Sequence, residues 1–259
     1  MNDRGAASNL GIHVYGFAAV ALGVNQLTWG DFAFIWHPVQ SGVPFRTALV
    51  YIVALCLIAA GVAVQRRSTA RIGLAVLTVL YVLAACLWLP RVIGYPQIFG
   101  TWGGFNEQFI LGVAGAIGYV SFASTSPMRD ARLIRREFVI LRTTFGVCVV
   151  ILGCVHFSAL PQTAAMVPAW IPPSQRFWAA ATGAAMILAG VSIIIGVQSP
   201  LSTRLFAALI GVFAVFVWLP RIYAEPLGHV AWAGTMITVA IAGGGWMVAD
   251  VMTPKGRGA

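Results

Sequence analysis

Trp88-Leu89-Pro90-Arg91 is repeated as Trp218-Leu219-Pro220-Arg221, at a distance of 221 − 91 = 130 residues. The same distance relates several further positions: Leu22-Gly23 and Leu152-Gly153, Gln26 and His156, Arg46 and Arg176, Pro96 and Pro226, Trp102 and Trp232, and Gly104 and Gly234. One register held over so many separated positions indicates a tandem duplication of a unit of roughly 130 residues. We expect a first unit in residues 1–123, a basic linker in 124–142 and a second unit in 143–259.

The composition indicates a membrane protein. Of the 259 residues, 59% are hydrophobic and only 9% are charged, and the mean hydropathy is +0.87. A soluble domain carries about 25% charged residues, so lipid must cover most of this surface. The formal net charge of +9 is explained by arginines in loops. Because no soluble domain carries a basic groove, we expect no nucleic-acid partner.

Apolar segments long enough, or nearly so, to cross a bilayer recur along the chain at roughly 20 residues each. We place eight of them, near 11–28, 46–65, 71–89, 105–123, 139–158, 176–197, 203–219 and 230–249. Backbone groups in lipid must be satisfied within the segment, and no alternating β-barrel pattern appears, so these segments are expected to be helices. The expected fold is an all-α membrane protein with eight transmembrane helices, arranged as two parallel four-helix repeats.

Basic residues are divided unequally between the two ends of these segments. One side holds four, Arg46, Arg91, Arg176 and Arg221. The other holds twelve: Arg4, Arg66, Arg67, Arg71, Arg129, Arg132, Arg135, Arg136, Arg142, Arg204, Lys255 and Arg257. Because basic loops stay in the cytoplasm, the second side and both termini are expected to be cytoplasmic. The sequence thus predicts a multi-pass protein of a bacterial-type inner (plasma) membrane, with membrane lipid as a partner.

The linker 124–142 carries arginines at near-helical spacing. A short interfacial helix lying against anionic headgroups would use them. A plain solvated linker, whose charges only set the topology, is the commoner arrangement and the one we favour.

The four arginines of the outer side carry the first functional hypothesis. Interfacial anchoring is the simpler role, with Trp in the aromatic belt, Pro ending a helix and Arg reaching headgroups. The alternative is a clamp for an anionic or carbonyl-bearing ligand, built from Arg46, Arg91, Arg176 and Arg221. The aromatic loops 29–45 and 159–175 lie on the same side, and we expect a shelf at headgroup level rather than a lid.

Other polar groups are expected at the same depth. Gln26 and His156 lie at the outer ends of the first and fifth segments. Glu107 lies at the outer start of the fourth, where it could neutralise Arg91, exchange protons or position a ligand hydroxyl. The second unit has no counterpart of the run Asn106-Glu107-Gln108, which suggests that one half binds and the other supports.

Metal and thiol chemistry have little support in the sequence. His37, His156 and His229 share the outer side, but no H-x-x-x-H or E-x-x-H spacing places two ligands on one helix face, so no metal or haem site is expected. The four cysteines form no C-x-x-C pair and are expected to behave as small hydrophobes.

The second unit resembles the DoxX-like family of small four-helix membrane proteins. The residues that carry the likeness are Gly153-Cys154-Val155-His156-Phe157, Met166-Val167-Pro168-Ala169-Trp170-Ile171-Pro172, Gly183, Gly190 and Leu219-Pro220-Arg221-Ile222-Tyr223. The resemblance implies a four-helix unit, here fused in tandem, and some relatives are linked to quinone-coupled thiosulfate oxidation or oxidative-stress complexes. The chain departs from the family at Met186, where a Glu is common, and at Gln26, which stands for the helix-end His.

These observations favour binding of a hydrophobic, polar-headed small molecule, a quinone or a lipid, in a pocket of the outer leaflet. Arg91 and Arg221 would hold the head group, and His156, Gln26 and Glu107 would tune it or donate protons. No covalently held cofactor is implied. Three alternatives stay open: a quinone-linked oxidoreductase site, a small-molecule transporter, and a helper subunit with a membrane or periplasmic partner protein.

Overall fold

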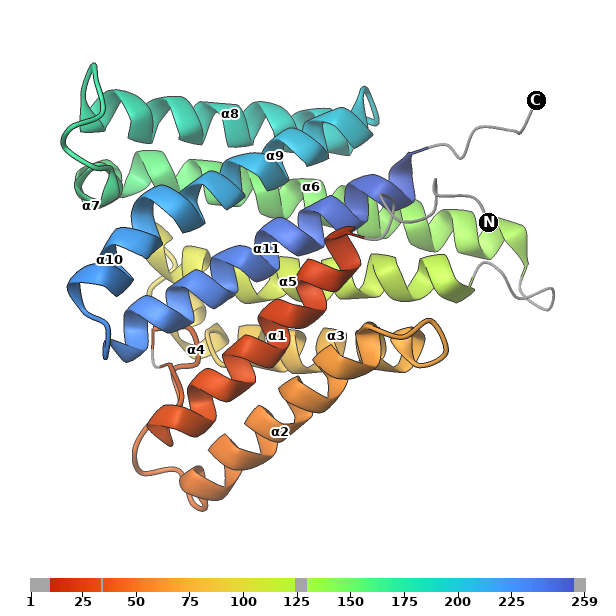
Figure 1. The fold of residues 1–259 in the computed structure, drawn as a ribbon. Coiled ribbons are helices and arrows are strands. Elements are labelled where there is room, and N and C mark those ends of the chain that lie inside the picture. The colour runs from red at the N-terminus through yellow and green to blue at the C-terminus, as the bar shows by residue number, and fades with distance from the viewer. Residues whose placement is uncertain (1–9, 34, 124–129, 254–259) are drawn as a thin grey trace.

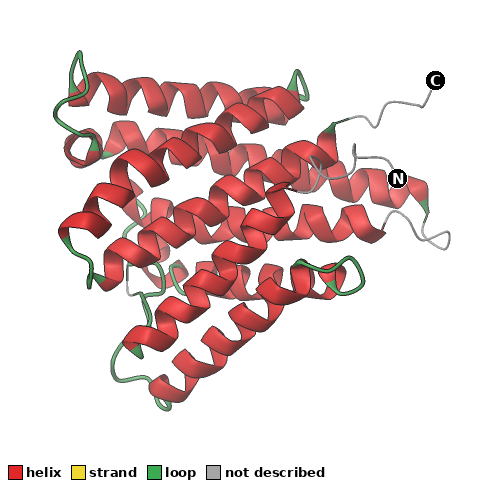
Figure 2. Ribbon diagram, viewed as in Figure 1, coloured by secondary structure: helices red, strands yellow, loops and turns green. Residues whose placement is uncertain are grey.

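The computed structural model describes residues 10–33, 35–123 and 130–253, and this part of the chain contains helices and no strand (Figure 2). The long helices are α1 (Leu10–Trp29), α2 (Arg46–Val64), α3 (Ala70–Cys86), α5 (Phe99–Ala123), α6 (Ala131–Ser158), α8 (Gln175–Ile195), α9 (Ser199–Phe213) and α11 (His229–Met252). Shorter elements are α4 (Leu89–Gly94), α7 (Leu160–Met166), α10 (Leu219–Ala224) and the π-helical turn η3 (Ala214–Trp218).

Within the described part of the chain, seven helical stretches are long and apolar enough to cross a membrane. They are Leu10–Trp29, Arg46–Val64, Ala70–Gly94, Ala131–Ser158, Gln175–Ile195, Ser199–Ala224 and His229–Met252. The helix α5 is not among them, although it has 25 residues, because it carries Asn106, Glu107 and Gln108. Asn106 and Gln108 are fully buried, so protein rather than lipid surrounds their side chains. The helices have the length and composition of a multi-pass membrane protein.

The long helices form a closed sequence of contacts. Each packs on the next in the order α1, α2, α3, α5, α6, α8, α9, α11, and α11 returns to α1 (Figure 1). The helices α5 and α11 also contact each other between the two halves. The first helix of each half therefore packs extensively on the last helix of the other half, α1 on α11 and α6 on α5. The halves are interlocked, which the sequence did not indicate.

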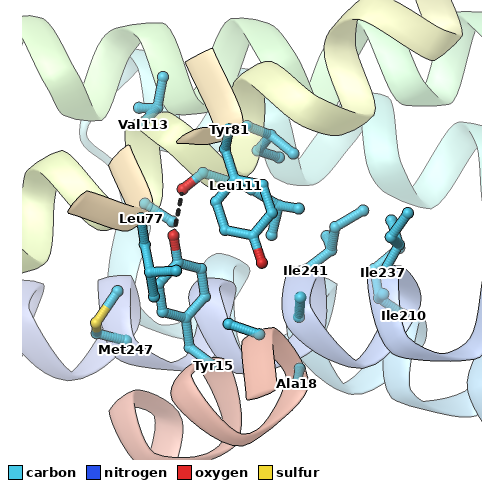
Figure 3. Packing of buried hydrophobic residues seen from close by; sticks show 14 of the residues in the cluster. Tyr15, Ala18, Leu77, Tyr81, Leu111, Val113, Ile210, Ile237, Ile241 and Met247 are labelled. Atoms are coloured by element: carbon cyan, nitrogen blue, oxygen red, sulfur yellow. Dashed lines mark hydrogen bonds between the residues drawn. The ribbon is translucent and has the colours of Figure 1, made fainter. Parts of the chain in front are cut away.

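The core lies where these helices converge. Tyr15 of α1 is fully buried, and its hydroxyl donates a hydrogen bond to the carbonyl oxygen of Leu111 in α5 at 2.9 Å (Figure 3). The ring of Tyr81, also fully buried, lies with its centroid 5.9 Å from that of Tyr15. Small residues allow backbones to approach closely where lipid supplies no hydrophobic drive for association. The central contacts thus join α1, α3 and α5.

The repeated Trp-Leu-Pro-Arg stretch forms the same local structure twice. Trp88 and Trp218 each directly precede a short helix that has Pro in its first turn. The ring of Trp88 packs on Gly104, and the ring of Trp218 packs on Gly234; a Cβ atom at either glycine would overlap the ring. The guanidinium groups of Arg91 and Arg221 lie over these rings, 5.0 and 5.2 Å from the centroids.

The register between the second helices of the two halves differs from the sequence prediction. Gly23 of α1 faces Ala54 of α2, whereas Gly153 of α6 faces Gly183 of α8. The distance between the glycines of α1 and α6 is 153 − 23 = 130, but between their partners it is 183 − 54 = 129. Arg46 and Arg176, which the sequence pairs at 130, are therefore one residue out of register in the packing.

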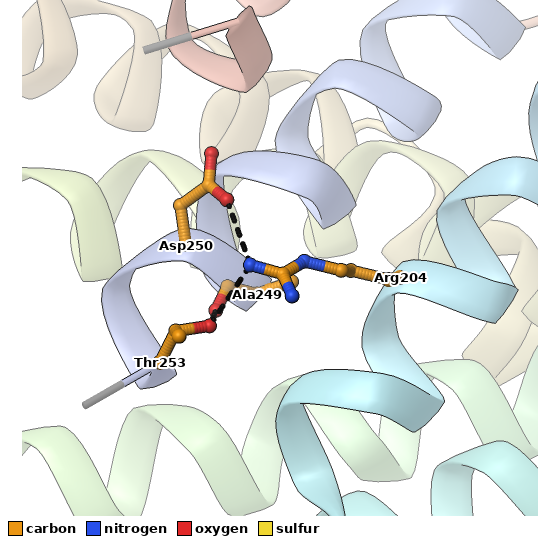
Figure 4. A network of polar contacts seen from close by, with 4 residues as sticks. All are labelled: Arg204, Ala249, Asp250 and Thr253. Carbon is orange, nitrogen blue, oxygen red and sulfur yellow. Dashed lines mark hydrogen bonds and ion pairs between the residues drawn. The ribbon is translucent and has the colours of Figure 1, made fainter. Parts of the chain in front are cut away.

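Arginines gather at both ends of the bundle. The start of α1 and the end of α11 lie at one end, and α4, α7 and α10 lie at the other (Figure 1). Beside the start of α1, Arg204 Nη2 contacts Asp250 Oδ1 at 3.4 Å and Thr253 Oγ1 at 3.0 Å, which ties α9 to α11 (Figure 4). The same end holds Arg66, Arg67, Arg71, Arg132, Arg135, Arg136 and Arg142.

The expected basic linker is helical over most of its length. Residues 131–142 form the first turns of α6, continuous with the apolar stretch that follows. The side chain of Asp130 caps this helix by accepting a hydrogen bond from the Arg132 backbone N–H at 2.8 Å. Residues 124–129 lie outside the described part of the chain, as do Arg4, Arg129, Lys255 and Arg257 of the basic set.

The indole–glycine contacts generate a stability prediction. We expect Gly104→Ala and Gly234→Ala each to cost about 1–3 kcal/mol of unfolding free energy, because the added methyl group overlaps a buried ring. Gly100→Ala on the same helix as Gly104 is the control, since a Cβ there meets nothing within 4 Å. Thermal unfolding in detergent measures the difference. Equal midpoints for Gly104→Ala and Gly100→Ala would contradict the packing.

Candidate functional site

A cavity of about 530 Å³ opens at the end of the bundle that carries α7 and α10. Its walls come mainly from the second half, from α6, α7, α8, α9, η3 and α11. The first half contributes Trp36, Gly103 and Glu107. Most of the lining is aliphatic or aromatic, so the cavity offers a ligand an apolar surface with few polar contacts.

His156 is the basic residue of the cavity wall, and it is held in one orientation. Its Nδ1 lies 3.1 Å from the carbonyl oxygen of Ala179 and 3.2 Å from Thr182 Oγ1, and its ring stacks on Phe213 at 5.8 Å. A carbonyl oxygen only accepts, so Nδ1 carries the proton in the neutral ring. The nitrogen left for a ligand is Nε2, which then acts as an acceptor.

Glu107 is the acidic residue among those that line the cavity. Its Oε2 accepts a hydrogen bond from Trp36 Nε1 at 2.8 Å. Trp36 is only 4% exposed, and its carbonyl oxygen accepts a hydrogen bond from Trp88 Nε1 at 3.0 Å. Its ring lies 5.7 Å from that of Trp218. The loop after α1 therefore brings Trp36 into contact with the tryptophans of both repeated stretches, through its backbone carbonyl with Trp88 and through its ring with Trp218.

The corresponding region of the first half is filled by the chain itself. Phe32, Trp36 and His37 of the loop 30–45 are all buried, and His37 Nδ1 lies 3.3 Å from Gln26 Nε2. Gln26 and Gln108 stand 130 residues before His156 and Thr238, which both line the cavity of the second half. The expected shelf at headgroup level is therefore wrong for these loop residues, because their aromatic side chains point inward. Phe34, at the middle of the loop, lies outside the described residues.

One wall of the cavity has an unusual backbone. Phe216, Val217 and Trp218 line the cavity from η3, a π-helical turn, whereas in the first half α3 simply ends at Cys86. Single π-helical turns inside α-helices occur frequently at functional sites. The two halves of the chain thus differ in this wall as well as in the loop.

The outer arginines do not form a common clamp around the cavity. Arg46 pairs with Asp31 and lies over Phe32, and Arg176 is exposed at the start of α8. Arg221 lines an adjoining hollow of about 370 Å³, which shares lining residues with the cavity. Of the predicted site residues, the structure brings His156 and Glu107 into the cavity wall and Arg221 to its border. Gln26 is buried beside His37, and Arg91 lies over Trp88.

Several residues of the cavity carried no signal in the sequence. Trp36 and Thr182 belong to a loop and to an apolar helix face, where each resembles its neighbours. Trp218 belongs to the repeated stretch, which did mark it. Within the described residues, no group of three or more His, Cys, Asp or Glu side chains could hold a metal ion.

Comparison with protein families, with characterised proteins and with solved structures finds no match for this chain. The chemistry of the cavity must therefore be argued from its own residues.

The burial of His37 in the first half leads to a prediction about how the stability of the protein depends on pH. Burial lowers the pKa of His37 to about 4, the neighbouring Gln108 side chain opposes this shift, and the nearby His229 adds to it. In the unfolded chain His37 binds a proton below about pH 6.5, the ordinary pKa of histidine. In the folded protein it binds this proton only near about pH 4. The free energy of unfolding therefore falls as the pH is lowered over this range, by up to about 3 kcal/mol. We expect His37→Gln to lose this part of the pH dependence.

The measurement is the thermal midpoint in detergent across that pH range. Val24→Ala, a change at a non-titrating, exposed position of α1, is the control and should keep the wild-type slope. Identical slopes in wild type and His37→Gln would contradict a buried, neutral His37.

Proposed function

We propose that the chain is an eight-helix protein of a bacterial-type inner membrane, made of two parallel four-helix repeats. The proposal makes α5 the eighth crossing, because α5 packs against α3, α6 and α11 and buries Asn106 and Gln108. Both termini would lie in the cytoplasm, since the described arginines beside the start of α1 outnumber those at the other end. The repeated Trp–Gly packing supports the duplication.

We further propose that the cavity of the second half binds a hydrophobic small molecule with a polar head, a quinone or a lipid, from the outer leaflet. One observation carries this proposal: the cavity is open in the second half, while the chain fills the corresponding space of the first half with Trp36 and His37. Its volume of about 530 Å³ falls within the range of about 300–1,000 Å³ typical of ligand sites.

The polar groups of the cavity suit such a molecule. His156 Nε2 would accept a hydrogen bond from a ligand hydroxyl, while Nδ1 stays on the Ala179 carbonyl. Glu107 would face the ligand from α5, with Trp36 holding its carboxylate. The resemblance to the DoxX-like family, with its quinone-linked members, supports the quinone as one of the two ligand classes.

Filling the cavity tests the proposal. Leu209 lines the cavity, whereas Leu205, one turn earlier on α9, is 61% exposed. We expect about one bound small molecule per chain in wild type and in Leu205→Trp, and none in Leu209→Trp, because the larger ring occupies the space. Mass spectrometry of organic extracts of the purified proteins gives the measurement. A wild type without bound small molecules, or equal loading of Leu209→Trp, would overturn the proposal.

A further inference from the structure

The polarity of the cavity changes with depth. Ile241 stands 241 − 229 = 12 residues into α11 and Met186 stands 186 − 175 = 11 residues into α8, about 16–18 Å below the helix starts. Glu107 stands 107 − 99 = 8 residues into α5, about 12 Å below its start, and His156 is two residues from the end of α6. The floor is therefore apolar, and the polar groups lie nearer the mouth.

Arg221 stands just outside this mouth. It lines the adjoining hollow, which shares Met166, Val167, Pro168, Trp170, Phe216 and Val217 with the cavity. Its guanidinium lies 5.2 Å from the ring of Trp218, which lines the cavity itself. Among the described residues, no carboxylate lies within ion-pair distance of Arg221. Its charge is therefore available to a ligand.

The order of these groups along the cavity matches an amphiphile. Glu107 lies on the inner side of the mouth, between Arg221 and the apolar floor. A molecule with its head at Arg221 would pass its chain beside Glu107 and bury the end of the chain on the apolar floor.

We propose that the ligand is a single-chain amphiphile with an anionic head, bound with the head on Arg221 and the chain in the cavity. The inference rests on the proposed function of the cavity and chooses within it, because a neutral quinone head would gain little from Arg221. A free carboxylate and the phosphate of a lipid are two sources of the same chemistry.

The first half supplies a matched control. Arg91 lies over Trp88 as Arg221 lies over Trp218, but Arg91 lines neither the cavity nor its adjoining hollow. Both arginines therefore lie over a tryptophan, and of the two it is Arg221 that lines the hollow beside the cavity. If a charge anywhere on the outer surface sufficed, the two should be equivalent.

The experiment measures equilibrium binding of radiolabelled dodecanoate, dodecyl phosphate, dodecanol and dodecyltrimethylammonium to the full chain in phosphatidylcholine nanodiscs. Empty nanodiscs give the background, and the pH keeps both anions ionised. We expect the anions to bind about tenfold more tightly than dodecanol, and the cation most weakly. Arg221→Gln should lower the affinity for both anions about tenfold, to the affinity for dodecanol. Arg221→Lys should keep the preference for anions. Arg91→Gln should leave the affinities for all four probes unchanged.

The outcomes separate this inference from the proposed function. Saturable, equal binding of all four probes that Leu209→Trp removes would overturn the anionic head and leave the cavity proposal standing. Equal losses in Arg221→Gln and Arg91→Gln, or no saturable binding of either anion, would also overturn the inference. Tighter binding of dodecanoate than of dodecyl phosphate would support the inference with a free carboxylate as the source, and the reverse order would support it with a lipid phosphate.

Discussion

The contact of an indole ring with a bare glycine backbone determines much of this structure. In lipid, helices gain little from burying apolar surface against one another, so close packing must supply the association energy. The rings of Trp88 and Trp218 press on Gly104 and Gly234, which fixes how the third helix of each half meets the last one. Trp36 contacts both tryptophans, Trp88 through its carbonyl oxygen and Trp218 through its ring. Trp36 and Trp218 both line the cavity, so these contacts also position part of its wall.

The interlocked order of helices explains how polar groups are tolerated in a chain of this composition. Asn106 Nδ2 donates a hydrogen bond to the Cys148 carbonyl oxygen at 2.7 Å, across the contact between α5 and α6. Gln108 and Gln26 lie in the first half beside His37, away from lipid. The helix α5, which carries Asn106, Glu107 and Gln108, is thus enclosed by other helices on several sides. A polar side chain in hydrocarbon is expensive, and here protein surrounds it.

The sequence predicted the helical class and most helix positions, because hydropathy and Pro act locally. It also selected His156, Glu107 and Arg221, which the structure places in or beside the cavity. It could not predict that Trp36 turns inward, since an aromatic residue in a loop fits a headgroup shelf equally well. The sequence repeat makes Arg46 and Arg176 equivalent positions, but in the packed structure they are one residue out of register. The reason is a one-residue difference in the loops, which moves α8 relative to α2. Long-range packing decided each of these points, and no local pattern encodes it.

The pairing of α1 with α11 has a consequence for how the protein is made. The helix α1 is synthesised well before α11, so its face with Gly11 and Val14, which contacts Met247 and Gly243, cannot meet this partner until α11 has been made. During that time Trp29, whose ring stacks on His229 in the folded protein, lacks this contact. Closure of the ring of helices therefore waits for α11, and a chain that stops before α11 leaves one face of α1 without its partner.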